Sequence, residues 1–286
     1  MSDEVARLSE KLRQIAASFD GVMGYSVHHL QTGDIVEYRA DERFPTASTI
    51  KVPTLVVALE ANQAGEIGYY DTMTYEEKYT YGGAGLLQNY QLGKKLELKE
   101  LLFLMMGISD NTATLMVMDW LGMERINQRM EEIGLPNTRI LSRLQHPGDE
   151  TRRLNGIYGW GMTTPGEMRL LMQWIATGKA GTPAATDEMQ RIMRREYFDD
   201  PVVVQHPPSV VVLHKGGAVE ASRSSVYFVF SPAGPYVVAV YTRENTDHRW
   251  TRENEAEQAI GRLARAIWRH YHPEHAWSPP EGIEAF

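Results

Sequence analysis

The first part of the chain carries a helical pattern of apolar residues, followed by strand patterns. Leu8, Leu12 and Ile15 recur at intervals of three or four residues, which predicts an amphipathic helix near the N-terminus. Residues 24–30 and 35–40 then form two strand-like runs joined by Gln-Thr-Gly-Asp, a typical hairpin turn. We therefore expect one helix and two antiparallel strands at the start of the fold.

From residue 48 to about residue 192 the apolar positions mostly follow a helical period. Short Gly or Pro breaks separate the segments, which include 49–65, 96–109, 111–123 and 124–135. Pro53 falls early in its segment, where a missing backbone N–H costs least. A block of packed helices is therefore expected here.

The strand pattern returns towards the C-terminus. Three β-branched and aromatic runs, 209–217, 224–234 and 235–244, are separated by Gly and Pro. Residues 254–272 then predict a last amphipathic helix.

The order of these elements predicts the fold. Strands joined by short turns form antiparallel sheets. We expect an α/β plus all-α fold: one antiparallel sheet built from both chain ends and flanked by the terminal helices, with a helical domain inserted between them. The predicted boundaries are residues 1–46 and 193–286 for a discontinuous α/β domain and residues 47–192 for the helical domain.

Composition and charge exclude several classes of protein. The 286 residues are 43% hydrophobic and 23% charged, as in soluble globular proteins, and the longest apolar run, 101–108, is too short to cross a membrane. A net charge of −8 argues against binding nucleic acid or an anionic membrane, because both need a basic face. The absence of cysteine excludes disulfides, thiolate catalysis and cysteine-ligated metals.

The N-terminal stretch also bears on the compartment. It lacks the basic-then-apolar layout of a signal peptide. The protein therefore either stays in the cytoplasm or is the mature form of a periplasmic or secreted protein, and the sequence leaves both open.

A Ser-x-x-Lys stretch marks the start of the helical block. Ser48 lies three residues before Lys51 in FPTASTIKVP, where a polar stretch gives way to an apolar one. On a helix this spacing brings the two side chains within reach, so that the lysine can activate the serine as a nucleophile. An ordinary helix start explains the stretch equally well, and the spacing occurs about once by chance in a chain of this length.

Two further motifs follow in order. Ser-Asp-Asn at 109–111 lies between two helical segments, and Lys-Gly-Gly at 215–217 follows a predicted strand. A helix cap explains the first motif alone, and a turn explains the second alone. These explanations do not account for all three motifs in this order, each at an element boundary.

Together the three motifs resemble the class A serine β-lactamases and the penicillin-binding-protein superfamily. The resemblance runs from about residue 24 to residue 271, with Gly216 in place of the usual Thr or Ser. It implies a β-lactamase/transpeptidase-like fold and a serine hydrolase that opens β-lactam rings through a Ser48 acyl-enzyme, which water releases. It also implies a monomer without cofactor or metal, whose substrate is a small molecule, either a β-lactam or an acyl-D-Ala-type amide or ester.

The resemblance also gives each motif residue a role. Ser109 passes a proton to the leaving nitrogen, and Asn111 hydrogen-bonds Lys51 and the substrate's side-chain amide. Lys215 attracts the substrate carboxylate. A second cation of this kind near a buried lysine lowers the lysine pKa, which suits Lys51 as a base.

An oxyanion hole is implied beside the last motif. It consists of the backbone N–H groups of Ser48 and Ala218, the latter next to Gly217. Arg223 is either a further partner of the substrate anion or an exposed strand residue.

The resemblance is weakest at the residue that frees the acyl-enzyme. Class A enzymes carry Glu-x-x-Leu-Asn on a loop; here Leu154 and Asn155 match, but Glu150 lies one position too early and Thr151 stands in strict register. Either the loop bulges so that Glu150 still reaches the water, or deacylation is impaired. A solvated loop carboxylate is the third interpretation of Glu150.

Two other functions therefore stay open. One is a D-alanyl carboxypeptidase or esterase of the same superfamily. The other is a non-catalytic penicillin-binding or sensor domain that remains acylated. Elsewhere, Thr164, Pro165 and Glu167 fit a capping box at a helix start, and residues 81–88 fit a cleft-edge loop with Tyr79 or Tyr81 beside it.

Overall fold

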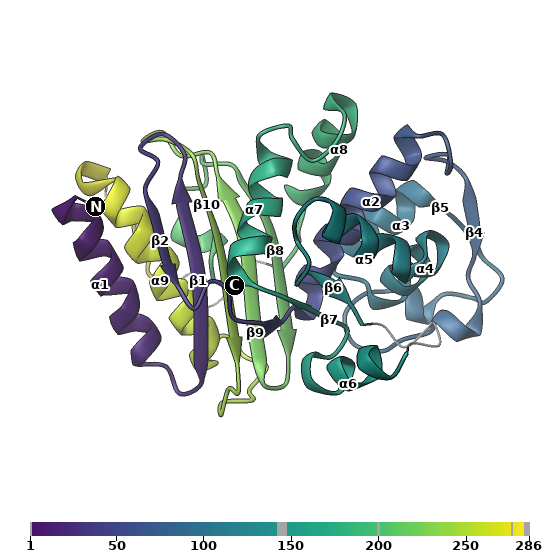
Figure 1. Cartoon of the computed structure of the whole chain (residues 1–286), viewed down its shortest axis with the longest axis horizontal. Helices are drawn as coiled ribbons and strands as arrows, with labels where there is room; N and C mark the ends of the chain where they lie inside the picture. The colour runs from purple at the N-terminus through teal and green to yellow at the C-terminus, as the bar shows by residue number, and fades with distance from the viewer. Residues whose placement is uncertain (1, 142–147, 199–200, 276, 283–286) are drawn as a thin grey trace.

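The computed structural model describes residues 2–141, 148–198, 201–275 and 277–282. Its central element is a five-stranded antiparallel sheet in the order β2-β1-β10-β9-β8 (Figure 1). The strands are β1 Val22–His29, β2 Ile35–Tyr38, β8 Val212–Val219, β9 Ser222–Val229 and β10 Tyr236–Arg243. Strand β1 pairs with β10 along its whole length, so the sheet joins both ends of the chain as the sequence predicts.

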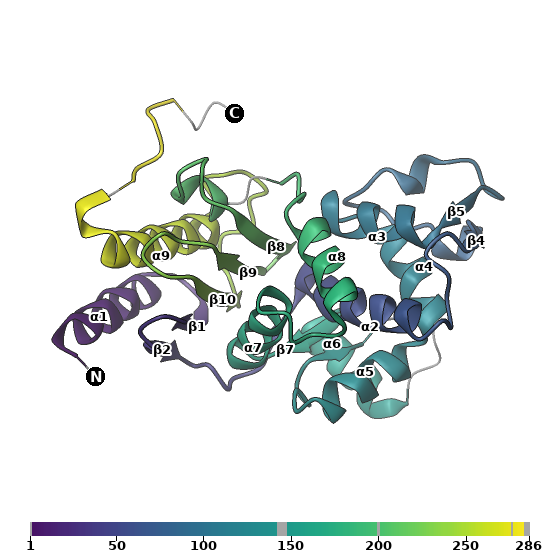
Figure 2. The same cartoon turned by 90° about the horizontal axis from the view of Figure 1, so that it is seen from above.

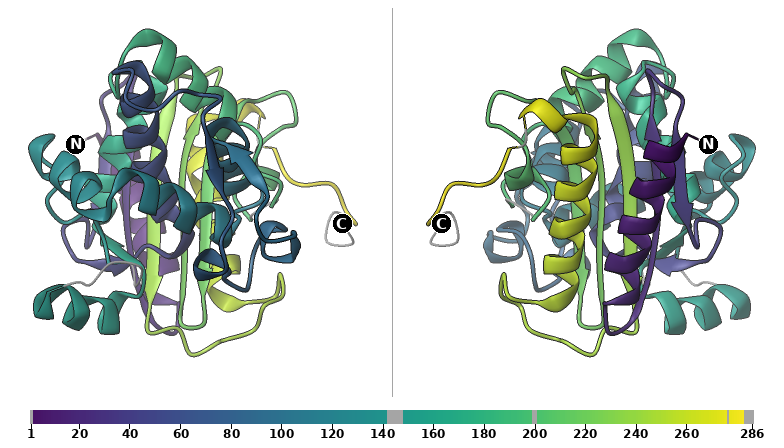
Figure 3. Two further views of the ribbon diagram at one scale, coloured as in Figure 1. Left: turned by 90° about the vertical axis from the view of Figure 1, so that its right-hand side faces the viewer. Right: turned by 90° about the vertical axis from the view of Figure 1, so that its left-hand side faces the viewer.

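The two terminal helices cover one face of this sheet (Figures 1 and 3). Helix α1 (Asp3–Ala17) and helix α9 (Glu255–Tyr271) each turn an apolar stripe towards the sheet. Side chains cap both helix starts, because Ser2 accepts the Val5 N–H at 3.3 Å and the Asn254 side chain accepts the N–H of the second helical residue. The predicted flanking helices are confirmed.

The opposite face of the sheet carries the helical part of the chain (Figure 2). Helix α7 (Pro165–Ala176) packs on β1, β9 and β10. Helix α2 (Lys51–Gln63) is buried on nearly all sides and contacts most of the helices around it. The helices that contact α2 are α3 Leu98–Gly107, α4 Asn111–Leu121, α5 Met123–Glu132 and α8 Pro183–Met193. Helix α6 (Asp149–Tyr158) belongs to the same part of the chain. The predicted α/β plus all-α layout is confirmed.

A continuous cluster of buried apolar residues links the two parts. It joins α2 and its neighbours to sheet residues such as Leu213, Val226 and Phe228. A second cluster fills the space between the sheet and the terminal helices. The exact domain boundaries, at residues 46 and 192, stay a prediction.

The sequence does not predict two small sheets. One consists of β3 (Phe44–Pro45), β7 (Gly161–Thr163) and β6 (Arg139–Ile140); the other pairs β4 (Thr72–Thr74) with β5 (Lys95–Glu97). Strands of two or three residues are too short to display a period of two. The first small sheet matters for the site, because β3 leads directly into the turn that carries Ser48.

The start of α7 has one half of the predicted capping box, because the Glu167 carboxylate does not return to the Thr164 N–H. Thr164 Oγ1 accepts the Glu167 N–H at 3.2 Å, and Pro165 occupies the first helical position. The Glu167 carboxylate accepts hydrogen bonds from Asn137 and Thr138, which ties α7 to the segment before β6.

None of the helices described in the structure combines the length and the apolar composition needed to cross a bilayer.

Candidate active site

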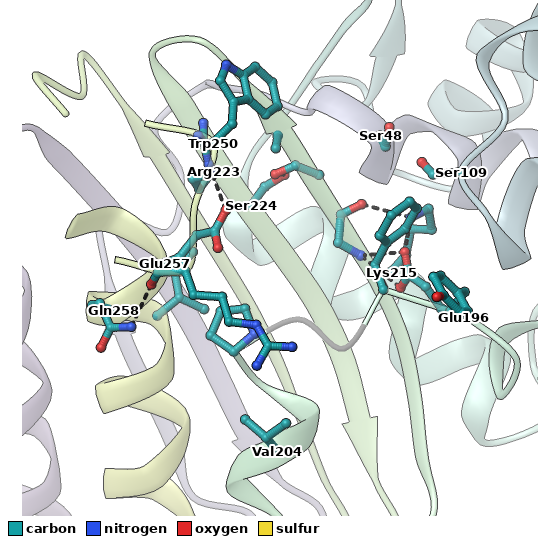
Figure 4. Close-up of a pocket in the computed structure, with 18 of the residues that line it drawn as sticks. Ser48, Ser109, Glu196, Val204, Lys215, Arg223, Ser224, Trp250, Glu257 and Gln258 are labelled. Carbon is teal, nitrogen blue, oxygen red and sulfur yellow. Dashed lines mark hydrogen bonds and ion pairs between the residues drawn. The ribbon is translucent and has the colours of Figure 1, made fainter. Parts of the chain in front are cut away.

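Ser48 lies where the sheet meets the helical part of the chain. It sits on a 3₁₀ turn, Ala47–Ile50, between β3 and α2. Strand β7 passes so close that a side chain at Gly161 would come within 2.7 Å of Ile50. Ala47 has a φ of 45°, a left-handed conformation that non-glycine residues adopt at a cost. This turn presents Ser48 to a cleft of about 1480 Å³ (Figure 4).

The side chain of Lys51 connects the first two motifs. Lys51 is only 1% exposed, and its Nζ lies 3.0 Å from Ser48 Oγ and 2.9 Å from Ser109 Oγ. The same Nζ also contacts the Ser109 carbonyl at 2.7 Å and Asn111 Oδ1 at 3.0 Å. The structure thus brings together four of the residues that the sequence singles out.

These contacts suit a neutral lysine. The Ser109 carbonyl can only accept a hydrogen bond, and so can Asn111 Oδ1, whose orientation is fixed because Nδ2 donates to the Gly82 carbonyl at 3.1 Å. A neutral amine has two N–H groups for these two acceptors. Its lone pair is then left to accept a proton from the hydroxyl of Ser48 or Ser109.

The electrostatic surroundings favour that neutral form. Burial of the amine, reinforced by the positive charge of Lys215, holds the pKa of Lys51 well below its ordinary value, against the opposing effect of Asp110 and Glu196. A lysine with a lowered pKa can act as a general base near neutral pH.

Asp110 fixes the Ser-Asp-Asn segment against the loop beside it. Its carboxylate caps α4 through the Ala113 N–H at 2.9 Å and accepts the N–H groups of Leu86 and Leu87 at 2.7 and 2.8 Å. A side chain at Gly85 would come within 2.3 Å of Asp110, so the loop needs a glycine there. Ser109, the preceding residue, has a φ of 54°, a strained conformation that is common at functional sites.

Strand β8 passes directly beside Ser48. A side chain on Gly217 would come within 2.8 Å of the Ser48 nitrogen, so only glycine allows this approach. Strand β8 is an edge strand, and the Gly216 N–H donates away from β9, to Glu196 at 3.1 Å. Because N–H groups two residues apart on a strand point the same way, the Ala218 N–H also faces the open edge.

The residue paired with Ala218 gives the same orientation. Arg223 on β9 turns its N–H towards β10, where Thr242 Oγ1 accepts it at 2.8 Å. Ala218 and Arg223 are therefore a non-hydrogen-bonded pair, which leaves the Ala218 N–H free of β9. The N–H groups of Ser48 and Ala218 can thus serve as the two donors of an oxyanion hole.

Lys215 has a partner that the sequence does not predict. The Lys215 ammonium, 1% exposed, is bound by the carboxylate of Glu196 and by the Gly216 carbonyl at 2.9 Å (Figure 4). His214 Nδ1 lies 2.6 Å from the same carboxylate. Burial favours the neutral acid, but the charge of Lys215 and the contact with His214 outweigh it and keep the pKa of Glu196 below its usual value.

Nothing in the sequence marks Glu196. It follows α8 in the charged stretch RREYF, 19 residues before Lys215, and no helical or strand period relates the two positions. Only the packing of α8 against β8 brings them together.

Arg223 is not the exposed strand residue that the sequence allowed. It is 2% exposed, and its guanidinium binds Glu257 at 3.0 Å on α9 and the Arg249 carbonyl at 2.8 Å. The ring of Trp250 covers it, with the guanidinium carbon 4.8 Å from the ring centre (Figure 4). The positive charge of Arg223 is therefore directed to the protein itself.

Residues 7–271 match the model of the beta-lactamase enzyme family, which covers most of the chain. The chain belongs to this family. A β-lactamase of Rhodobacter capsulatus is 24% identical over 273 residues, which are 93% of this chain and 89% of that relative. A β-lactamase of Mycobacterium tuberculosis is 26% identical over 249 residues, 82% of this chain and 77% of the relative.

Solved structures of β-lactamases and of PBP-A share the fold. A β-lactamase from Sphaerobacter thermophilus has a TM-score of 0.80 at 25% identity, over 96% of this chain and 99% of its own. PBP-A has a TM-score of 0.80 at 27% identity, over 92% of this chain and 96% of its own. A PBP-A mutant solved as an acyl-enzyme complex with penicillin G has a TM-score of 0.80 at 26% identity, over 92% of this chain and 97% of its own. The predicted β-lactamase/transpeptidase-like fold is therefore confirmed.

Unlike the other motif residues of this beta-lactamase family member, Glu150 and Asn155 are not brought to Ser48. The stretch forms helix α6 and not a bulged loop, and Glu150 in its first turn pairs with Arg153 at 2.9 Å. The Glu150 side chain is 69% exposed, and the hydrogen bond from Arg153, helped by the charge of that residue, lowers the pKa of Glu150. Asn155 Nδ2 donates to the backbone carbonyls of Leu141 and Gly159. Neither residue lines the cleft that the described residues form.

The glycine-rich loop lies at the edge of the cleft, as the sequence predicts. Gly83 and Ala84 line the cleft. Tyr79 is instead buried against α4, where its hydroxyl donates to Asp119. Tyr81 packs edge-on against Trp160, with the two ring centres 4.7 Å apart.

Proposed function

We propose that this member of the beta-lactamase family is a class A-like serine hydrolase that opens β-lactam rings through an acyl-enzyme on Ser48. One observation carries the proposal. The buried Lys51 amine lies 3.0 Å from Ser48 Oγ and 2.9 Å from Ser109 Oγ, which is hydrogen-bond distance to both hydroxyls. The names of the relatives support the same substrate class.

In the acylation step, the substrate carbonyl oxygen is placed at the N–H groups of Ser48 and Ala218. Lys51 accepts the Ser48 hydroxyl proton as Oγ adds to the carbonyl carbon, and the negative charge develops on the carbonyl oxygen. Ser109 then passes a proton from the lysine to the ring nitrogen. The C–N bond breaks, and the opened product stays attached to Ser48 as an ester.

Deacylation requires a second proton acceptor. Water must add to the ester carbonyl while a base takes its proton, after which Ser48 leaves with a proton of its own. The sequence suggests Glu150 for this base, with Asn155 beside the water. Glu150 can take this role only if α6 rearranges, since its carboxylate is paired with Arg153 at the exposed face of that helix.

A second candidate follows from this placement of Glu150. If no base replaces it, the chain forms the Ser48 ester and keeps it, as a penicillin-binding or sensor protein, or hydrolyses slowly as a D-alanyl carboxypeptidase or esterase. The similarity to PBP-A supports this candidate.

A time course of intact-protein mass after mixing with benzylpenicillin tests the two candidates. For the hydrolase we expect a mass increase of one penicillin molecule within seconds and its loss within minutes. A persistent adduct identifies the second candidate. If neither an adduct nor ring-opened penicillin appears, with Ser48→Ala as the blank, both candidates are wrong.

A further inference from the structure

Two buried cations line the strand side of the cleft, and a carboxylate of the protein holds each one. Glu196 binds the ammonium of Lys215, and Glu257 binds the guanidinium of Arg223 at 3.0 Å. Lys215 and Arg223 are 1% and 2% exposed, and the pair of Lys215 with Glu196, whose side chain is 4% exposed, is shielded from water and salt. Neither cation has its charge available in full for a ligand.

The Glu196 carboxylate occupies a pair of donors of the kind that can bind a carboxylate. Besides the Lys215 ammonium, it accepts the backbone N–H of Gly216 at the edge of β8, at 3.1 Å. An ammonium beside a strand-edge N–H is a strong binding site for a carboxylate. His214 supports this arrangement from behind, with Nδ1 2.6 Å from Glu196 and Nε2 2.8 Å from Ser225 Oγ on β9.

Three exposed aromatic side chains stand among the polar residues that line the cleft. Tyr197 and Phe198 directly follow Glu196, line the same cleft, and are 75% and 47% exposed. Trp250, 68% exposed, lines the cleft further along β8. Exposed aromatic rings at a cleft favour apolar groups of a ligand.

We propose that Glu196 fills the anion site of the cleft, so that this protein selects acyl donors whose group beside the scissile amide is uncharged and apolar, such as an ester, over those with a free carboxylate. The inference rests on the proposed Ser48 chemistry and names its substrate class. Glu196 is here a specificity-determining residue.

The physical basis is repulsion between like charges. A substrate carboxylate that approaches Lys215 meets the negative charge of Glu196 at close range, in a partly desolvated site where such contacts discriminate strongly. Gly216 offers no hydroxyl to compensate. A neutral ester avoids this repulsion and can pack its alkyl group against the aromatic rim.

The test compares benzylpenicillin with its methyl ester. The second-order rate constant for Ser48 acylation is measured for both compounds by intact mass, in the parent and in Glu196→Gln. The Gln side chain keeps the size and loses the charge, so Lys215 is freed for the substrate. We expect the ester-to-acid rate ratio to fall at least about tenfold in Glu196→Gln.

Glu220→Gln is the matched control. Glu220 lines the same cleft, its side chain is 79% exposed, and its substitution removes the same charge. Its ratio should stay within about twofold of the parent, because an exposed charge is screened. Equal ratios in the parent and Glu196→Gln overturn the inference, as does an equal fall in both variants.

A measurement on the parent alone covers the case in which Glu196→Gln does not fold. The parent's ester-to-acid ratio is divided by the ratio for the uncatalysed reaction of the same compounds with hydroxylamine, a neutral nucleophile. We expect a quotient of about ten or more, and a quotient of one or below overturns the inference. If neither compound acylates the parent, the proposed function is wrong and the inference falls with it.

Discussion

At the scale of single residues, the proposed mechanism requires Lys51 to be neutral before Ser48 can react. Burial and Lys215 lower the pKa of Lys51, while Glu196 raises it. The acylation rate should therefore rise with pH, and this rising limb of the pH profile should lie well below the usual lysine pKa. Because removal of a negative charge lowers the pKa of a nearby cation, Glu196→Gln should move this limb to lower pH. The pH profile of acylation by the neutral methyl ester measures both.

Glu220→Gln is again the control for that profile, since Glu220 is not among the groups that shift the pKa of Lys51. A limb that stays in place or moves to higher pH in Glu196→Gln would contradict the role of Lys51 as the base.

At the scale of elements, the position of β8 beside Ser48 depends on Gly217. A methyl group there would lie 2.8 Å from the Ser48 nitrogen and 2.6 Å from Ser224 Oγ. Gly217→Ala should therefore push β8 away from the nucleophile and misplace the Ala218 N–H. We expect acylation to slow about 100-fold or more, the typical effect of losing an oxyanion donor. Stopped-flow acylation kinetics measure it.

Gly156→Ala is the matched control for Gly217→Ala. Gly156 lies within α6, where an added methyl group meets no other atom within 4 Å. Alanine in a helix interior stabilises by about 0.5–1 kcal/mol relative to glycine, so folding should improve and acylation should not change. Normal acylation in Gly217→Ala would refute the proposed oxyanion geometry.

The elements also show which features sequence reasoning can reach. Long periodic segments such as α9 and β10 are predicted because a regular apolar face extends over several residues. Strands β3 and β7 have two or three residues and are missed. Ser48 and Lys51 are recognisable because they lie three positions apart in the sequence, on a 3₁₀ turn and at the start of the helix that directly follows it. Glu196 is not, because its partner Lys215 belongs to another element and only tertiary packing joins them.

The register of Glu150 shows a related limit. A one-residue shift from a family motif has no structural meaning in the sequence, since a loop can absorb it by bulging. In the structure the stretch is helix α6, where the pair with Arg153 at i and i+3 turns Glu150 to solvent.

At the scale of the whole molecule, a buried histidine links stability to pH. His206 lies between the sheet and α9, with Nε2 2.7 Å from the Tyr236 hydroxyl and its ring against Trp268. Burial lowers the pKa of His206 from 6.5 to about 4. Below pH 6.5 the unfolded chain gains a proton that the folded protein does not, so stability is complete above 6.5 and is lost as pH falls towards 4.

The expected loss over this range is on the order of 3 kcal/mol, since one unit of pKa corresponds to about 1.4 kcal/mol. Urea unfolding between pH 7.5 and 4 measures it. His206→Gln keeps a hydrogen-bonding side chain without the titration, so its stability should depend less on pH. An equally steep dependence in that variant would assign the effect to other groups.

For the molecule as a whole, the central proposal is that Ser48 is a nucleophile that Lys51 activates. The most direct measurement is the rate and site of covalent modification by benzylpenicillin methyl ester, from intact mass and peptide mapping. We expect one adduct on the peptide that contains Ser48 in the parent, none in Ser48→Ala, and acylation slowed at least about 100-fold in Lys51→Ala, with all three proteins folded. An adduct that persists in Ser48→Ala, or acylation at the parent's rate in Lys51→Ala, would contradict the account.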